Sequence, residues 1–132
     1  MNNNNIVSEL QNKLLQDIAQ KIDNITAIYD HIPISPNLPY IHISQYELED
    51  NILISGKVIY ITLDFNIKAY YVANAFSSCN KLTDYLLNLN DTEFSVNKYK
   101  ILSVYILKTN HINKDNTTIS SVKTKISLIK TQ

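Results

Sequence analysis

Residues 57–67, KVIYITLDFNI, alternate between polar and apolar side chains without interruption, and this period of two predicts a β-strand. One side of the strand carries Ile59, Ile61, Leu63, Phe65 and Ile67. Clean alternation is typical of antiparallel sheets with one solvent-exposed face, because strands buried on both faces are apolar throughout. The pattern therefore requires other elements that cover the apolar face.

Two amphipathic segments can provide that cover. Apolar residues recur every four positions over about 6–23, which predicts a helix, and residues 1–5 before it are expected to be disordered. A second apolar stripe predicts a helix over about 69–89, opened by Tyr70 and Tyr71. Both helices are expected to pack on the same face of the sheet.

The remaining strands are shorter or less regular. Alternation and turn residues place them at 27–32, 39–46, 92–96, 98–108 and 118–130. Pro33, Pro36 and Pro39 have no backbone N–H to donate, so the segment between the first two strands is expected to be a loop. Two polar segments are expected as connections, namely an acidic hairpin loop at 47–57 and a turn at 110–116.

Together these elements predict a single α+β domain over residues 1–132, with a mainly antiparallel sheet and two helices packed on one face. The expected order is helix–β–β–β–helix–β–β, with a third strand after the second helix if the short segment 92–96 is counted. A chain of 132 residues with 45% hydrophobic side chains is long enough to build one core of this kind.

Few residues of this chain match a catalytic or cofactor-binding pattern. Arginine is absent and Gly56 is the single glycine, so neither a guanidinium fork nor a glycine-rich phosphate loop is present. The single cysteine, Cys79, falls on the apolar stripe of the second predicted helix, where a small core residue is expected. His31, His42 and His111 lie on separate segments and match no metal-ligand spacing. We therefore expect no enzyme activity, no cofactor and no metal site.

Charge is unevenly distributed along this neutral chain. Residues 1–97 have 5 lysines and 11 acidic residues, a net charge of −6, whereas residues 98–132 have 7 lysines and 1 acidic residue, a net charge of +6. Either solvated strand faces or complementary surfaces between copies of the chain would explain this division. Aromatic residues are also enriched in protein interfaces. The candidate contact residues are Glu47, Glu49, Asp50, Tyr60, Tyr70, Tyr71, Lys123 and Lys125.

No targeting segment is recognisable. The N-terminal sequence MNNNNIVSEL has neither the basic start nor the apolar stretch of a signal peptide. No segment approaches the ~20 apolar residues that span a bilayer. We therefore expect a cytoplasmic protein without membrane contact.

The proline-containing segment resembles a pattern found in a known family. Residues 28–33, IYDHIP, are followed by residues 39–43, PYIHI, and then by an alternating strand, a long helix and paired C-terminal strands. This order, after an N-terminal amphipathic helix, is similar to the tail-completion, or tail-terminator, proteins of long-tailed (siphovirus-like) phages and gene transfer agents. The motif positions are Tyr29, Asp30, His31, Pro33, Pro39 and Tyr40.

The resemblance implies a structural virion protein without a catalytic role. Such proteins form a ring, commonly of six copies, that caps the tail tube and offers a surface to the head. The implied partners are other copies of the chain, the tail tube protein and a head–tail connector or neck protein.

The implied location is the tail or neck of a particle assembled in the cytoplasm. Lys123 and Lys125 would face either a neighbouring copy or a lumen through which DNA passes without specific binding. Two alternatives stay open: another neck or minor tail component of the same fold, and a small cytoplasmic ligand-binding domain.

Overall fold

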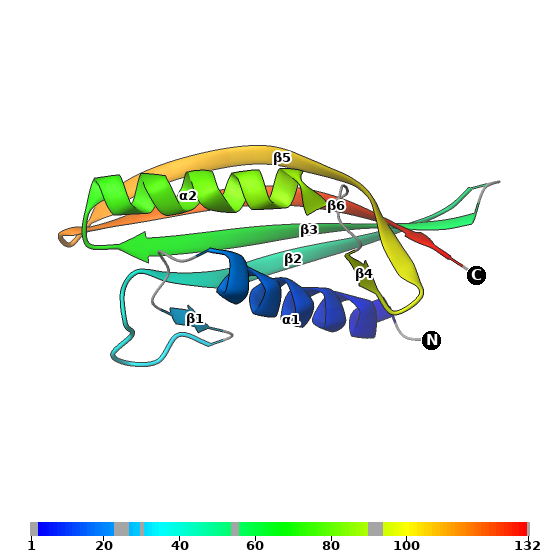
Figure 1. Ribbon diagram of the computed structural model, residues 1–132, viewed down its shortest axis with the longest axis horizontal. Coiled ribbons are helices and arrows are strands. Elements are labelled where there is room, and N and C mark those ends of the chain that lie inside the picture. The colour runs from blue at the N-terminus through cyan, green and yellow to red at the C-terminus, as the bar shows by residue number, and fades with distance from the viewer. Residues whose placement is uncertain (1–2, 23–26, 30, 54–55, 90–93, 132) are drawn as a thin grey trace.

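The computed structural model describes residues 3–22, 27–29, 31–53, 56–89 and 94–131, which form two helices and a six-stranded sheet (Figure 1). The elements follow the chain as α1 (Asn3–Lys21), β1 (Ala27–Tyr29), β2 (Tyr40–Leu53), β3 (Gly56–Ala69), α2 (Val72–Leu87), β4 (Ser95–Val96), β5 (Tyr99–Lys114) and β6 (Thr117–Lys130). Their spatial order in the sheet is β1-β2-β3-β6-β5-β4. β1 is parallel to β2, and the other neighbouring strands are antiparallel. The predicted α+β class is confirmed.

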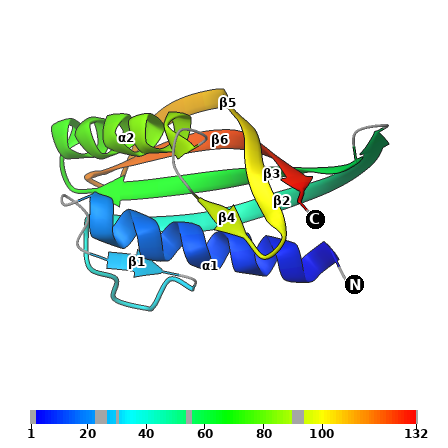
Figure 2. The ribbon, with the colours of Figure 1, turned by 45° about the vertical axis from the view of Figure 1, so that its right-hand side comes forward.

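Both helices lie on the same face of the sheet (Figures 1 and 2). Their apolar stripes pack with the apolar side of β3 and β6 in one buried cluster. That cluster includes Leu10, Leu14 and Ile18 of α1, Cys79, Leu82 and Leu86 of α2, Ile59 to Ile67 at alternate positions of β3, and Val122, Ile126 and Leu128 of β6. Full burial of each such leucine or isoleucine contributes about 1.5–3 kcal/mol. The alternation of β3 therefore determines which face the helices cover.

β2 is longer than predicted, and the acidic loop expected at 47–57 is wrong. Most of that segment continues β2, and β3 begins at Gly56. The ladder with β3 pairs Glu47 with Thr62, Glu49 with Tyr60, and Asp50 with Ile59. The acidic residues are thus held in a strand, although the side chain of Asp50 is outside the described part.

A β-bulge explains why a period-two pattern misses this continuation. The register of β2 against β3 shifts between Ile43 and Gln45. Ile43 pairs with Phe65 before the bulge. Leu48 pairs with Ile61 after it, on the same helix-covered face. Odd-numbered residues of β2 face the helices before the bulge and even-numbered residues do so after it, because an extra residue moves every later side chain to the other face.

The polar turn expected at 110–116 is also shorter than predicted. β5 continues through most of this segment, and only Asp115 and Asn116 connect it to β6. Both residues have positive φ, 51° and 62°. A two-residue turn with positive φ at both positions matches the twist of a hairpin, and Asp and Asn tolerate this region better than most residues. His111 therefore lies within β5, paired with Ser120, and not in a loop.

Both helices begin at residues other than those predicted. α1 already includes residues 3–5, which the sequence pattern placed outside the helix. α2 begins at Val72, because β3 extends to Ala69 and Tyr71 is the N-cap residue with an extended backbone. Tyr70 and Tyr71 thus lie between β3 and α2, and not in the first helical turn.

Candidate subunit interface

The face of the sheet opposite the helices is not covered by any described helix or strand. In Figure 1 this open face points away from the viewer. Neighbouring strands place its side chains in rows across the sheet. One row holds Glu47, Thr62, Lys125 and Tyr105, and the next holds Glu49, Tyr60, Ser127 and Ser103. Five of the predicted contact residues, Glu47, Glu49, Tyr60, Lys123 and Lys125, therefore share one surface.

The two glutamates and the two predicted lysines of this open face lie on different strands. Glu47 and Glu49 are exposed on β2, whereas Lys123 and Lys125 lie half-buried on β6. Lys125 Nζ is 4.8 Å from the centre of the Tyr60 ring. Such a cation–π contact is worth about 0.5–1 kcal/mol at an exposed site. Tyr60 and Lys125 are thus oriented by each other.

A polar pocket of about 270 Å³ lies on the open face and extends from β2 to β5. Its lining consists of Ser44, Asp64, Asn66, Lys108, Asn110, Ser121 and Lys123. Ser121 Oγ donates a hydrogen bond of 2.8 Å to Asn66 Oδ1. Two lysines against one carboxylate give the pocket a net positive charge, which favours an anionic group on a binding partner.

Both edges of the sheet are open over most of their length. β1 pairs with β2 only from Tyr40 to His42, and β4 pairs with β5 only at Tyr99 and Lys100. Within the described ranges, no strand pairs with the outer side of β2 beyond His42 or with that of β5 from Ile101 onward. Unpaired edges present backbone groups to which a strand of another chain can bind.

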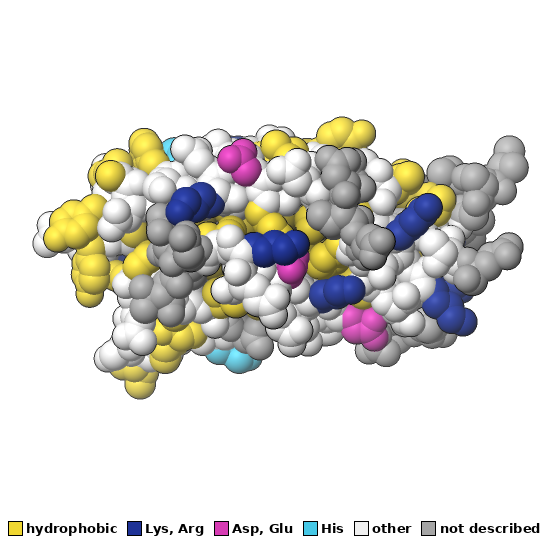
Figure 3. Space-filling view, in the orientation of Figure 1, with side chains coloured by type: hydrophobic (Ala, Val, Ile, Leu, Met, Phe, Trp, Pro, Cys, Tyr) yellow, Lys and Arg dark blue, Asp and Glu magenta, His cyan; other side chains and the backbone are white. Residues whose placement is uncertain are grey.

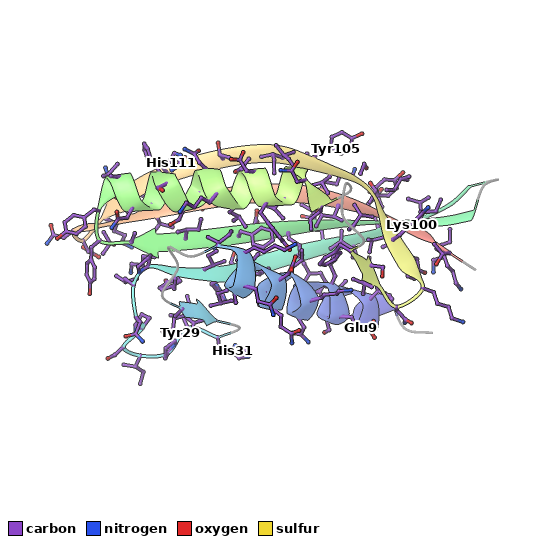
Figure 4. The ribbon with its side chains drawn as sticks, in the orientation of Figure 1. Glu9, Tyr29, His31, Lys100, Tyr105 and His111 are labelled. Carbon is purple, nitrogen blue, oxygen red and sulfur yellow. The ribbon has the colours of Figure 1, made fainter. Side chains whose placement is uncertain are left out.

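The β5 edge also exposes large apolar side chains. Leu102, Tyr105 and Leu107 are 48%, 59% and 51% exposed. Leu102 and Leu107 occupy two β-bulges, which interrupt the simple alternation of this strand. Figure 4 shows Tyr105 projecting outward beyond β5, and Figure 3 shows hydrophobic side chains along the same margin. Apolar side chains on a long unpaired edge are typical of an association surface.

Tyr70 and Tyr71 belong to a second exposed surface, at the end of the sheet where β3 meets α2. Both are exposed, and Tyr70 lines a pocket of about 400 Å³ together with the β5–β6 turn. Figure 3 shows this apolar end of the molecule on the left.

His111 of β5 contacts α2 and β6. The Phe76 ring centre lies 4.1 Å from that of His111, whose Nδ1 is 2.7 Å from Ser120 Oγ. These contacts place His111 on the helix-covered side, away from the charged rows.

Two tyrosines of the family-like motif hold the proline loop. Tyr29 Oη accepts a hydrogen bond of 2.9 Å from the backbone N–H of Asn37. The Tyr29 ring is edge-on to that of Tyr40, with centres 5.5 Å apart. Burial, and secondarily the neighbouring Tyr29, raise the pKa of the Tyr40 hydroxyl. The backbone N–H of Ala27 donates to the Pro39 carbonyl at 3.3 Å. The motif thus attaches β1 and its loop to β2.

The other motif residues contribute less to the attachment of β1 and the proline loop to β2. β1 ends at Tyr29, short of the predicted position 32, and Asp30 lies outside the described residues. His31 and Pro33 are exposed. Figure 4 shows Tyr29 and His31 beside α1, where both line a pocket of about 240 Å³. The motif therefore lies at the edge of the sheet opposite to β5.

Metal-ligating side chains are not clustered in the described part of the chain. There, no three His, Cys, Asp or Glu side chains are close enough to hold a metal ion. Cys79 is buried in the core, as predicted, and burial raises the pKa of its thiol, with a smaller opposing effect of a hydrogen bond with Thr83. A raised pKa disfavours the reactive thiolate. None of the described helices is long and apolar enough to cross a membrane.

The candidate contact residues predicted from the sequence do not include the exposed residues of the β5 edge, above all Tyr105, Leu107 and Lys108. β6 is the last strand in the chain, yet it lies between β3 and β5, so β5 is left near the edge. One sequence signal was available. Residues 101–107, ILSVYIL, have apolar side chains on both sides of the strand, more than a strand with one wet face needs.

Comparison with known proteins gives a structural relationship. No protein-family model matches this chain, and no match was found among curated proteins. A search of solved structures found similar folds. One is a chain in a structure described as "Virion of native gene transfer agent (GTA) particle", with a TM-score of 0.77 and 14% sequence identity. The alignment covers 94% of this chain and 97% of that chain. At this identity the comparison shows a shared fold.

Proposed function

We propose that this chain is a structural virion protein that caps a tail tube as a ring and takes part in joining the tail to the head. The observation that carries the proposal is the fold shared with a chain of a gene transfer agent virion over nearly the full length of both chains. The motif in residues 28–33 and 39–43 and the element order, which resemble tail-terminator proteins, support the same role.

The surfaces described above suit a ring subunit. A ring requires two different patches that meet between adjacent copies, and further surface for the structures above and below it. The acidic β2 edge and the basic, apolar β5 edge supply two different patches on opposite sides of the sheet. The exposed aromatic end with Tyr70 and Tyr71 supplies a third surface, which we assign to the tail tube or the connector.

Deletion of the gene from the element that encodes it tests this role. Electron microscopy of the resulting particles is expected to show filled heads separate from tails, and tails of irregular length. Complementation with the wild-type gene should restore joined particles. Complementation with a Tyr70→Ser/Tyr71→Ser variant should restore fewer of them, provided that its circular dichroism and melting temperature match the wild type.

Normal joined particles in the deletion strain would refute the proposal. Gold-labelled antibodies then locate the protein in wild-type particles. Label at the head–tail junction is expected. Label elsewhere along the tail would instead assign the chain to another neck or minor tail component of the same fold.

A further inference from the structure

We propose that copies of this chain associate by strand pairing, in which the outer edge of β5 in one copy binds the outer edge of β2 in the next. This inference rests on the proposed ring and names the surfaces that meet between neighbouring subunits. It follows from the strand order, the charges and the exposed apolar residues of the two edges.

Strand directions allow the sheet to continue from one copy to the next. The four long strands β2, β3, β6 and β5 are each antiparallel to their neighbour, so β2 and β5 run in opposite directions. β2 of a second copy in the same orientation would therefore lie antiparallel to β5. Because the two edges differ, the contact is heterologous, and its repetition closes into a ring where the rotation permits.

The open segments of the two edges match in length and in the placement of their charges. β2 is open over residues 43–53 and β5 over residues 101–114. Placed antiparallel, they overlap for nearly their full length, with the end of β5 beside the start of the open part of β2. In this alignment Glu47 and Glu49 lie in the same part of the interface as Lys108. All three residues belong to the open face, so the continued sheet brings opposite charges together.

Charge favours this pairing over the pairing of like edges. Glu47 and Glu49 are exposed on β2, and Lys108 and Lys114 are exposed on β5. Lys108 also lies directly opposite Lys123 in the β5–β6 ladder, an arrangement that repels within one copy. Asp64, opposite Lys123 in the β3–β6 ladder, offsets part of that repulsion, and a neighbour's carboxylates would offset more of it. Two β5 edges, or two β2 edges, would repel each other instead.

Apolar side chains on both edges add a driving force. β5 exposes Leu102, Tyr105 and Leu107, and β2 exposes Tyr46. Removal of these side chains from water stabilises an interface in proportion to the apolar area buried. The bulges on both strands deform the edges, which limits pairing with unrelated strands. The exposed apolar side chains therefore favour association of the two edges, and the bulges and charges favour this pair of edges over others.

Two charge-reversal variants test the pairing. The first, Lys108→Glu/Lys114→Glu, makes the β5 edge acidic. The second, Glu47→Lys/Glu49→Lys, makes the β2 edge basic. Association of the purified proteins is measured by light scattering after size exclusion and by native mass spectrometry, over a concentration series at low salt. We expect the wild type to form rings, weakened by salt, and each variant alone to associate about tenfold more weakly or worse.

A mixture of the two variants in equal amounts should recover association. The acidic β5 edge of the first meets the basic β2 edge of the second, and the unaltered edges also match, so a ring of alternating copies can close. Glu9→Lys/Asp84→Lys is the matched control for the Glu47→Lys/Glu49→Lys variant, because it makes the same charge change at exposed positions on the helices and should associate like the wild type. Circular dichroism verifies that every variant is folded.

Three results would each overturn the edge pairing: a wild type that stays monomeric over the whole series, variants that associate as well as the wild type, or a mixture that recovers nothing. The proposed function is judged separately by the deletion experiment. If the deletion leaves heads and tails unjoined while the charge variants still support assembly, the virion role stands and the edge pairing is wrong.

Discussion

Tyr85→Phe removes a hydroxyl that joins the two helices. Tyr85 Oη donates to Asp17 Oδ2 at 2.6 Å, and Asp17 also forms an ion pair with Lys21 at 3.4 Å. A hydrogen bond to a charged acceptor contributes about 1.5–3 kcal/mol. Asp17 would keep Lys21 as a partner, and its side chain is 23% exposed to water. We therefore expect the free energy of unfolding to fall by about 1.5 kcal/mol, the lower end of this range.

Urea denaturation measures this loss directly. In a thermal melt the same loss should lower the melting temperature by about 5 °C for a chain of this length. Asp17→Asn is the matched control, since it keeps an oxygen acceptor for Tyr85 but removes the charge, and it should cost less than Tyr85→Phe. A change below about 0.5 kcal/mol in Tyr85→Phe would refute the reasoning, because it would show that the hydroxyl contributes little net stability.

The pH dependence gives a second check on the same contact. Burial, followed by the hydrogen bond to Asp17 and the charge of Asp17, raises the pKa of Tyr85 well above its usual value. The unfolded chain therefore releases this proton first as the pH rises. The contribution of Tyr85 to stability is constant below about pH 10 and falls above it, by at most about 1.4 kcal/mol per pH unit. The stability difference between wild type and Tyr85→Phe should shrink over this range, and a constant difference up to pH 11 would contradict the raised pKa.

Three further substitutions test other parts of the structure. Thr124→Val should raise the free energy of unfolding by about 1 kcal/mol in urea, because its buried hydroxyl has no hydrogen-bond partner among the described residues; a loss of stability would contradict this. Asn116→Val should lower stability by about 1–2 kcal/mol, whereas Asn116→Gly should not, since φ at this position is 62°; equal melting temperatures would argue against the turn. Tyr29→Phe should lower the free energy of unfolding by about 1 kcal/mol and speed proteolysis of the 31–39 loop, because the hydrogen bond to Asn37 is lost. An unchanged cleavage rate would show that Tyr29 does not hold this loop.

Predictions that depended on local periodicity agree with the structure. The apolar side of β3 from Ile59 to Ile67 is buried, and so are Val122, Ile126 and Leu128 of β6. The apolar stripes of both helices face the same core, except that Val72 and Phe76 at the start of α2 are exposed. Each of these patterns arises within one element, because side chains repeat every two residues in a strand and every 3.6 in a helix.

Predictions failed where the chain departs from a regular period. The bulge after Ile43 reverses the phase of β2, and the acidic residues beyond it look like a loop in the sequence. The polar residues 110–114 look like a turn, yet pairing with β6 holds them in β5. In both cases a neighbouring strand supplies the hydrogen bonds that local propensity does not predict.

The candidate contact residues show the same difference between what the sequence predicts and what the fold decides. Composition and charge indicated Glu47, Glu49, Tyr60, Lys123 and Lys125 as single residues, and the strand register places them on one face. The sequence did not indicate that β5 would be an open edge, because that depends on the position of β6 between β3 and β5.

The sequence by itself determined which side chains of the two helices, β3 and β6 turn toward a core, since that depends on the repeat of a single regular element. It also determined the separation of acidic and basic residues along the chain. Only the tertiary structure decided which strands are neighbours, where their registers shift and which edges stay unpaired. Those features depend on contacts between residues far apart in the sequence. They place charged residues and tyrosines that are scattered along the chain on two different edges of one sheet.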